Sequence, residues 1–113
     1  MDFDKSKSFA SFNKCLEDNQ NQINSNLNVR ICATERFTPI GSRCFEYTGN
    51  IKFIQNKKSG VLEIPVLVAL LFTDKFKTDE QEFLYIEKEH KLRINFNFNT
   101  IEPFSRVLIE VYF

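Results

Sequence analysis

The chain has 113 residues, of which 42% are hydrophobic and 27% charged, a balance that excludes intrinsic disorder and predicts one globular domain over residues 1–113. Lysine plus arginine and aspartate plus glutamate number 15 each, so the formal net charge of zero argues against a protein that binds mainly by neutralising phosphates. The three glycines are too few for a glycine-rich phosphate-binding loop.

The start of the chain and its cysteines bear on the compartment. The first residues, MDFDKSKSF, lack the charged-then-apolar pattern of a signal peptide, and the chain holds no Asn-x-Ser/Thr glycosylation motif. Cys15, Cys32 and Cys44 are an odd number of widely spaced cysteines. These features predict free thiols in a reducing intracellular compartment, cytoplasmic or nuclear, and no association with a membrane.

The most apolar stretch, VLEIPVLVALLF, extends over residues 61–72 and predicts a strand that is buried on both faces. It is too short for a membrane-spanning helix, which needs about 20 apolar residues. Pro65 lacks a backbone N–H, so it is expected at an edge, a bulge or the first turn of the strand. The fully buried part is therefore predicted at Val66–Phe72.

A helix is predicted over residues 8–25, with Ser8 as the cap of its first turn. The apolar residues that mark its buried stripe recur every three or four positions, at Phe9, Phe12, Leu16, Ile23 and Leu27. Several asparagines are poor helix formers and predict that the helix frays near Ser25. Residues 1–7 are polar and charged without a pattern, and a flexible segment is expected there.

Residues 28–113 predict antiparallel β-structure. A first strand is expected at Val29–Ala33, and Thr38–Gly41 has the proline and glycine of a turn. A second strand is predicted from Arg43 to about Gln55, with Gly49 as a bulge or bend inside it. The polar residues Asn56–Gly60 then predict a hairpin loop.

The second half of the chain predicts a surface loop, a hairpin and a terminal strand. The charged interval at residues 75–81 indicates a surface loop or short helical turn, while Phe83–Ile86 and Leu92–Phe98 would pair about a tip at residues 88–91. The terminal strand, Val107–Phe113, is apolar on both faces. The expected fold is an antiparallel β-sandwich or barrel of five to six strands with one N-terminal helix, or alternatively an α+β fold whose curled sheet wraps the helix.

The reactive residues predict no catalytic site, no metal site and no cofactor. His90 is the only histidine and lies in the charged hairpin tip, where a solvated side chain is expected rather than a general base. The cysteines lack zinc-site spacing and are expected as small buried hydrophobes, with a redox-sensitive pair of Cys32 and Cys44 across a hairpin as an alternative. The carboxylates without the pattern of a calcium loop are Asp74, Asp79, Glu80 and Glu82.

A binding face is predicted on one strand, where polar residues alternate with apolar ones. These residues are Arg93, Asn95, Asn97 and Asn99, spaced about 7 Å apart, and they could hydrogen-bond a partner or simply form the solvated side of the strand. Leu108 and Tyr112 extend the prediction, because a terminal strand that is apolar on both faces can be an edge to which another chain adds.

An alternative face interleaves aromatic with basic residues, as in sheets that stack single-stranded bases. Its residues are Phe45, Tyr47, Lys52, Phe53, Lys57 and Lys58. An OB-like domain would present such a face, although the basic excess that usually accompanies nucleic-acid binding is missing.

Three functions follow, in decreasing order of support. The first is a small non-enzymatic protein-binding module, such as an adaptor, inhibitor or accessory subunit, that binds another protein or a second copy of itself through a sheet face or edge strand. The second is a single-stranded nucleic-acid-binding domain. The third is an enzyme whose site would combine scattered carboxylates with a cysteine.

Overall fold

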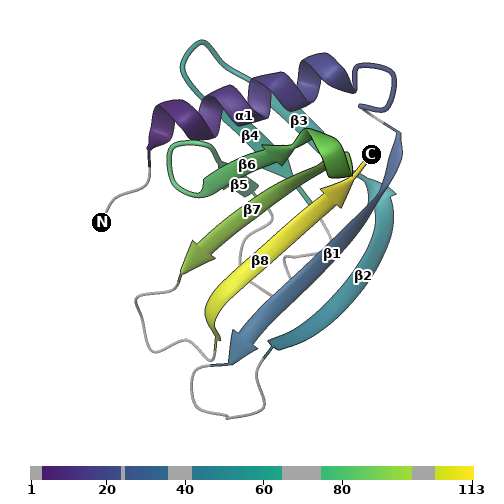
Figure 1. The fold of residues 1–113 in the computed structure, drawn as a ribbon, viewed down its shortest axis with the longest axis vertical. Coiled ribbons are helices and arrows are strands. Elements are labelled where there is room, and N and C mark those ends of the chain that lie inside the picture. Colours follow the sequence, from purple (N-terminus) through teal and green to yellow (C-terminus); the bar gives the residue numbers. More distant parts are fainter. Residues whose placement is uncertain (1–3, 24, 36–41, 65–74, 98–103) are drawn as a thin grey trace.

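The computed structural model describes residues 4–23, 25–35, 42–64, 75–97 and 104–113 (Figure 1). The chain is mainly β with one N-terminal helix, as predicted. The helix is α1 (Lys5–Asp18), and a short 3-10 turn, η2, covers Glu87–Glu89. The strands are β1 (Asn26–Glu35), β2 (Ser42–Asn50), β3 (Lys52–Gln55), β4 (Gly60–Glu63), β5 (Lys75–Lys77), β6 (Glu82–Ile86), β7 (Lys91–Asn97) and β8 (Phe104–Tyr112).

The strands form two antiparallel sheets. One has five strands in the order β2-β1-β8-β7-β6, and the other has three in the order β3-β4-β5. In the view of Figure 1 the five-stranded sheet lies in front of the smaller sheet, and α1 runs alongside β6. Neither sheet closes on itself in the described part of the chain, so the open, layered form of the prediction is confirmed and the closed barrel is not.

The core lies between the two sheets and α1. Phe12 of α1 is fully buried, with its ring centroid 5.8 Å from that of Phe83 on β6 and 6.2 Å from that of Phe53 on β3. The helix therefore contacts both sheets through one aromatic side chain. Most of the remaining buried core comes from alternate positions of the strands, which include Val29, Ile31, Leu62, Leu92, Ile94, Val107, Ile109 and Val111.

The helix begins and ends earlier than predicted. Its N-cap is Asp4, whose carboxylate accepts hydrogen bonds from the N–H groups of Ser6 and Lys7 at 2.9 and 3.3 Å. Residues 5–7, predicted to be flexible, thus belong to the first turn. Ser8 is not a cap but a buried residue inside the helix, and the helix ends at Asp18, well before Ser25.

The predicted second strand is two strands in different sheets. The chain leaves the five-stranded sheet after Asn50 and enters the three-stranded sheet at Lys52, with Ile51 fully buried at the crossing. Gly49 keeps regular pairing opposite Leu27, so the predicted bend at the glycine is wrong and the break lies two residues later. The chain therefore changes direction at Ile51, whose side chain is buried between the sheets, and not at the flexible backbone of Gly49.

The terminal strand is not an edge. β8 pairs with β1 on one side and with β7 on the other, which places it in the middle of the five-stranded sheet. Its apolar character on both faces therefore reflects a central position. Among the described strands, the outermost members of this sheet are β2 and β6.

The remaining predictions have mixed outcomes. The β6–β7 hairpin and the Asn56–Gly60 loop between β3 and β4 are confirmed. The interval at residues 75–81 is instead a short strand, β5, followed by a turn in which Thr78 is buried. The predicted strand Val66–Phe72, Pro65 and the turn at residues 38–41 lie outside the described residues. No helix in the described ranges is long and apolar enough to cross a membrane.

Candidate interaction face

One face of the five-stranded sheet points away from the core, and we call it the outer face. Successive residues of a strand point to opposite sides, so the residues between the buried core positions share this face. It comprises Asn28, Arg30, Cys32 and Thr34 of β1, Arg106, Leu108, Glu110 and Tyr112 of β8, Lys91, Arg93 and Asn95 of β7, Cys44, Glu46 and Thr48 of β2, and Glu82, Leu84 and Ile86 of β6.

Glu110 lies at the centre of the outer face and is only 6% exposed. Its carboxylate is 2.6 Å from the ammonium of Lys91 and 3.5 Å from the guanidinium of Arg93, and it accepts a hydrogen bond from the Tyr112 hydroxyl at 3.2 Å. Burial alone raises the pKa of Glu110, but the hydrogen bond and charge of Lys91 outweigh it and hold this pKa below the ordinary glutamate value. Glu110 is therefore an ionised, paired carboxylate.

The structure brings together most of the residues predicted to bind a partner. Asn95 of β7 lies directly opposite Leu108 of β8, and Tyr112 lies opposite Lys91, so the two predicted groups share adjacent strands and one face. The Asn95 amide oxygen accepts a hydrogen bond from Arg106 Nε at 3.0 Å. Arg93 and Asn95 thus form cross-strand contacts rather than an isolated row.

Two further members of the predicted row are placed less fully. Asn97 pairs with Arg106 in the backbone register. Asn99 lies outside the described residues.

The prediction missed the cations of the neighbouring strands. Arg30 lies directly opposite Glu110 on β1, and Arg106 lies two positions from Leu108 on β8. The alternation of polar and apolar residues at positions 28–33 indicates that Arg30 points outward. Its position beside β8 depends on a pairing between strands about 80 residues apart, which no local pattern reveals.

A shallow groove of about 430 Å³ opens on the β2 side of this face. Its polar lining includes Asn28, Arg30, Glu46, Thr48 and Tyr112. Within it, Thr48 Oγ1 donates a hydrogen bond to Asn28 Oδ1 at 2.6 Å. Arg30 and Glu46 lie opposite one another in the register, yet neither makes an ion pair with another described residue.

The residues of the alternative nucleic-acid face do not share a surface. Phe45 and Tyr47 belong to β2 in the five-stranded sheet, whereas Lys52 and Phe53 belong to β3 in the smaller sheet. Phe53 packs on the core, with its ring centroid 6.1 Å from that of Phe113. Lys57 and Lys58 are exposed in the β3–β4 loop. The predicted continuous aromatic-basic surface is therefore not formed.

The reactive residues lie apart from one another. His90 is exposed at the hairpin tip, where it adopts a left-handed conformation with φ 52°. Asp79, Glu80 and Glu82 are exposed, and Asp74 lies outside the described residues. Within those residues, no group of three or more potential metal ligands comes together.

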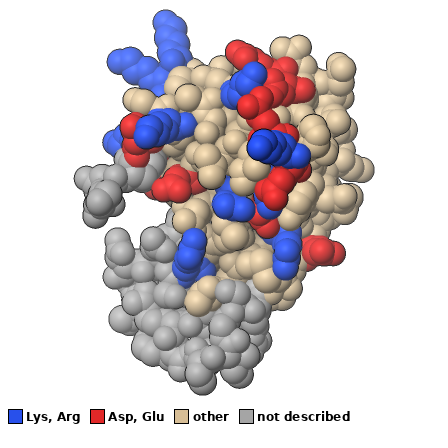
Figure 2. Space-filling model, in the orientation of Figure 1, with Lys and Arg blue, Asp and Glu red and all other residues tan. Residues whose placement is uncertain are grey.

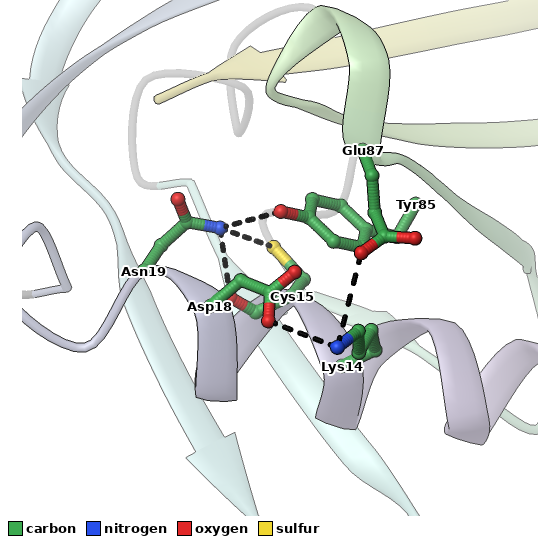
Figure 3. Close-up of polar contacts among 6 residues, drawn as sticks. All are labelled: Lys14, Cys15, Asp18, Asn19, Tyr85 and Glu87. Atoms are coloured by element: carbon green, nitrogen blue, oxygen red, sulfur yellow. Dashed lines mark hydrogen bonds and ion pairs between the residues drawn. The ribbon is translucent and has the colours of Figure 1, made fainter.

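Cys15 belongs to a network that joins the end of α1 to the β6–η2 segment (Figure 3). Asn19 donates from Nδ2 to the Cys15 carbonyl at 2.9 Å and to the Tyr85 hydroxyl at 3.2 Å. Lys14 pairs with Asp18 at 3.1 Å and with Glu87 at 3.8 Å. These contacts position the end of the helix. Burial raises the pKa of the Cys15 thiol to about 12, so this thiol is unreactive.

The other two cysteines differ from the prediction. Cys32 and Cys44 pair across β1 and β2 and form a disulfide, and Cys44 is exposed while Cys32 is half-buried. Neither cysteine is therefore a small buried hydrophobe. The alternative prediction, that these two cysteines pair across a hairpin, agrees with their positions. The bridge lies on the outer face, beside Leu108.

Comparison of the chain with models of protein families, with curated proteins and with solved structures finds no match. The function is therefore argued from the geometry of the outer face.

Proposed function

We propose that this protein is a small non-enzymatic binding module that contacts another protein, or a second copy of itself, through the outer face. The observation that carries the proposal is the convergence of Arg93, Asn95, Leu108 and Tyr112 on adjacent strands of one face. Interfaces favour arginine and tyrosine side chains that are held in place before the partner arrives. The cross-strand bonds to Glu110 and Asn95 hold several of these side chains in that way.

The face of the sheet, rather than a strand edge, supports this role. β8 is paired on both sides, so strand addition at the C-terminal strand is not proposed. The β6 edge is also occupied, because the Ser8 hydroxyl of α1 accepts from the Phe83 N–H and donates to the Gln81 carbonyl, both at 3.0 Å. The outer face instead offers both charged groups and the exposed Leu84, at 44% exposure.

We propose the cytoplasm or nucleus as the compartment, a setting in which stable disulfides are rare. In that setting the Cys32–Cys44 bridge has to be open to reduction by cellular thiols. The exposure of Cys44 supports this.

The test compares two matched variants of the tagged protein in a pull-down from native extract. Leu84 and Ile54 are aliphatic residues with nearly equal exposure, at 44% and 42%, but Ile54 lies on the three-stranded sheet. Leu84→Glu should remove a stoichiometric protein that wild type and Ile54→Glu both retain. Light scattering of the purified protein checks the self-association form of the proposal.

Three outcomes decide the result. Loss of the protein with Leu84→Glu alone, unchanged by nuclease, supports the module. Equal capture by all three proteins, or capture that nuclease abolishes, contradicts it. Recovery of monomeric bait alone from every extract also contradicts it.

A further inference from the structure

We infer that the outer face binds an acidic protein segment that carries carboxylates and an apolar side chain. This inference rests on the proposed function and names the chemistry of its partner. Its basis is an excess of cations at the centre of a protein whose formal net charge is zero.

The central strands of the sheet concentrate positive charge. The described outward side chains of β1, β8 and β7 include four cations, Arg30, Arg106, Lys91 and Arg93, and one carboxylate, Glu110. Glu46 and Glu82 lie at the two sides, on β2 and β6. Figure 2 shows this side of the molecule, with Lys and Arg side chains interspersed with Asp and Glu. Glu89 also lies 3.3 Å from Lys91, so the four central cations outnumber the two carboxylates beside them, Glu110 and Glu89, by two.

The charge of Glu110 is already matched by one of these cations. Lys91 lies 2.6 Å from one Glu110 oxygen and 3.3 Å from Glu89, and its side chain is 12% exposed. Arg93 contacts the same Glu110 oxygen at the longer distance of 3.5 Å. Its Nε is buried without a hydrogen-bond partner. A partner cannot reach this buried atom, but the Arg93 side chain is 36% exposed and its guanidinium is held only by the long contact to Glu110.

The two exposed arginines add further donors on both sides of Glu110. The Arg30 side chain makes no hydrogen bond or ion pair with another described residue. Arg106 donates from Nε to Asn95, and its side chain makes no other hydrogen bond or ion pair with a described side chain. Arg30 and Arg93 both lie opposite Glu110 in the register, which puts their backbones about 10 Å apart across two strand spacings. Guanidinium groups bind carboxylates in a two-pronged geometry, so this arrangement suits a partner with several carboxylates.

An apolar contact completes the chemistry of the partner. Leu108 is half-buried among Asn95, Cys32 and the charged residues of β8, and the exposed Leu84 lies opposite Arg93. A polyphosphate backbone has no apolar group that could pack on these leucines, and the carboxylates of Glu46 and Glu82 would repel it. A protein segment with alternating acidic and apolar side chains can pair its carboxylates with the arginines and pack its apolar groups on the leucines.

The experiment measures fluorescence anisotropy of the full chain with a labelled peptide of alternating glutamate and leucine. A lysine–leucine peptide of equal length and a thymidine oligonucleotide are the comparison probes. We expect the acidic peptide to bind best, and more weakly as salt increases. The variant Arg30→Gln/Arg106→Gln should weaken binding at least about tenfold, because two guanidiniums without an ion pair to a described residue are lost.

A matched control carries the same loss of charge elsewhere. Lys52→Gln/Lys57→Gln removes two exposed cations outside the outer face and should leave the affinity unchanged. Glu46→Gln removes a carboxylate beside Arg30 and should tighten binding. Equal weakening by both double variants would overturn the inference, since it would show only a response to net charge.

The remaining outcomes separate this inference from the proposed function. Tighter binding of the oligonucleotide, or no preference for the acidic peptide, overturns the acidic partner. If a protein captured from extract is still lost with Leu84→Glu, the module stands and only its partner chemistry is wrong. If that capture also fails, both are wrong.

Discussion

Among single residues, Glu110 determines how the charges of the outer face are arranged. It lies on a face that points away from the core, yet its neighbours leave it only 6% exposed. Lys91, Arg93 and the Tyr112 hydroxyl all contact its carboxylate. A carboxylate held in this way aligns side chains from β7 and β8 before any partner binds, which lowers the entropic cost of binding.

Replacing Glu110 with glutamine should lower the free energy of unfolding by about 1–3 kcal/mol, because Lys91 and Arg93 lose their charged partner. Urea denaturation measures the change. Glu46→Gln, an exposed residue of the same face, is the control and should change stability by less than about 0.5 kcal/mol.

The effect of Glu110→Gln should also depend on pH. The folded-state pKa of Glu110 lies below the ordinary value of 4.5, chiefly because Lys91 overcomes the opposing effect of burial. The stabilisation is therefore complete above pH 4.5 and is lost as the pH falls through the lowered folded-state pKa. A stability difference between wild type and variant that stays constant down to strongly acidic pH would contradict this assignment.

The three cysteines should differ sharply in reactivity. Because burial raises the pKa of Cys15 to about 12, native protein treated with iodoacetamide near pH 8 should carry no label while the Cys32–Cys44 bridge is intact. Reduction of the folded protein should expose two labelling sites, and unfolding with reductant should expose three. Two labels before reduction, read by mass spectrometry, would show that the bridge is absent.

At the scale of elements, α1 is attached to the edge of the five-stranded sheet by a buried hydroxyl. Ser8 is 1% exposed and bonds the backbone of both Gln81 and Phe83. A serine inside a helix would otherwise compete with helical backbone bonds, but here its hydroxyl satisfies the unpaired groups of an edge strand. This contact both holds the helix and covers the β6 edge.

Ser8→Ala should therefore destabilise the protein more than removal of the helix cap does. Loss of the hydroxyl leaves the buried Phe83 N–H and the half-buried Gln81 carbonyl without this partner, at a cost of about 1–3 kcal/mol. Asp4→Ala should cost about 1 kcal/mol as the loss of an N-cap. Ser6→Ala, at an exposed position of the same helix, should be nearly neutral in thermal unfolding. A larger loss with Asp4→Ala than with Ser8→Ala would contradict this account of the Ser8 hydroxyl.

At the scale of the whole molecule, Phe12 joins α1 to both sheets, and Gly60 makes room for it. A Cβ atom at Gly60 would lie 2.3 Å from Phe12 Cε1, closer than any unstrained contact. The Phe12 ring is fully buried and packs near Phe53 and Phe83, so it has little space in which to move. The glycine is therefore required by close packing.

Gly60→Ala should lower the free energy of unfolding by about 1–3 kcal/mol through overpacking. Gly49→Ala is the matched control. Its new Cβ would meet the outer end of the half-buried Tyr47 side chain, which can move away at lower cost. Denaturant unfolding compares the two variants, and an equal or larger loss at Gly49 would contradict this account of Gly60.

Local patterns in the sequence predicted those parts of the fold that depend on neighbouring residues. The alternation at residues 91–95 correctly placed Leu92 and Ile94 in the core and Arg93 and Asn95 on the outside. The helical spacing correctly identified Phe12 as a buried residue of the helix. In each case the burial of a side chain follows from the period of its own element.

Features that depend on distant partners were decided only by the tertiary structure. Ser8 resembles a cap in sequence, but its partners lie more than 70 residues away. The apolar β8 is central because it pairs with β1, and the same pairing puts Arg30 beside Glu110. The sequence by itself therefore determined which apolar residues point inward where an element keeps a clear period, because that follows from backbone geometry. The order of the strands, and with it the composition of the outer face, arises from long-range pairing that local periodicity does not encode.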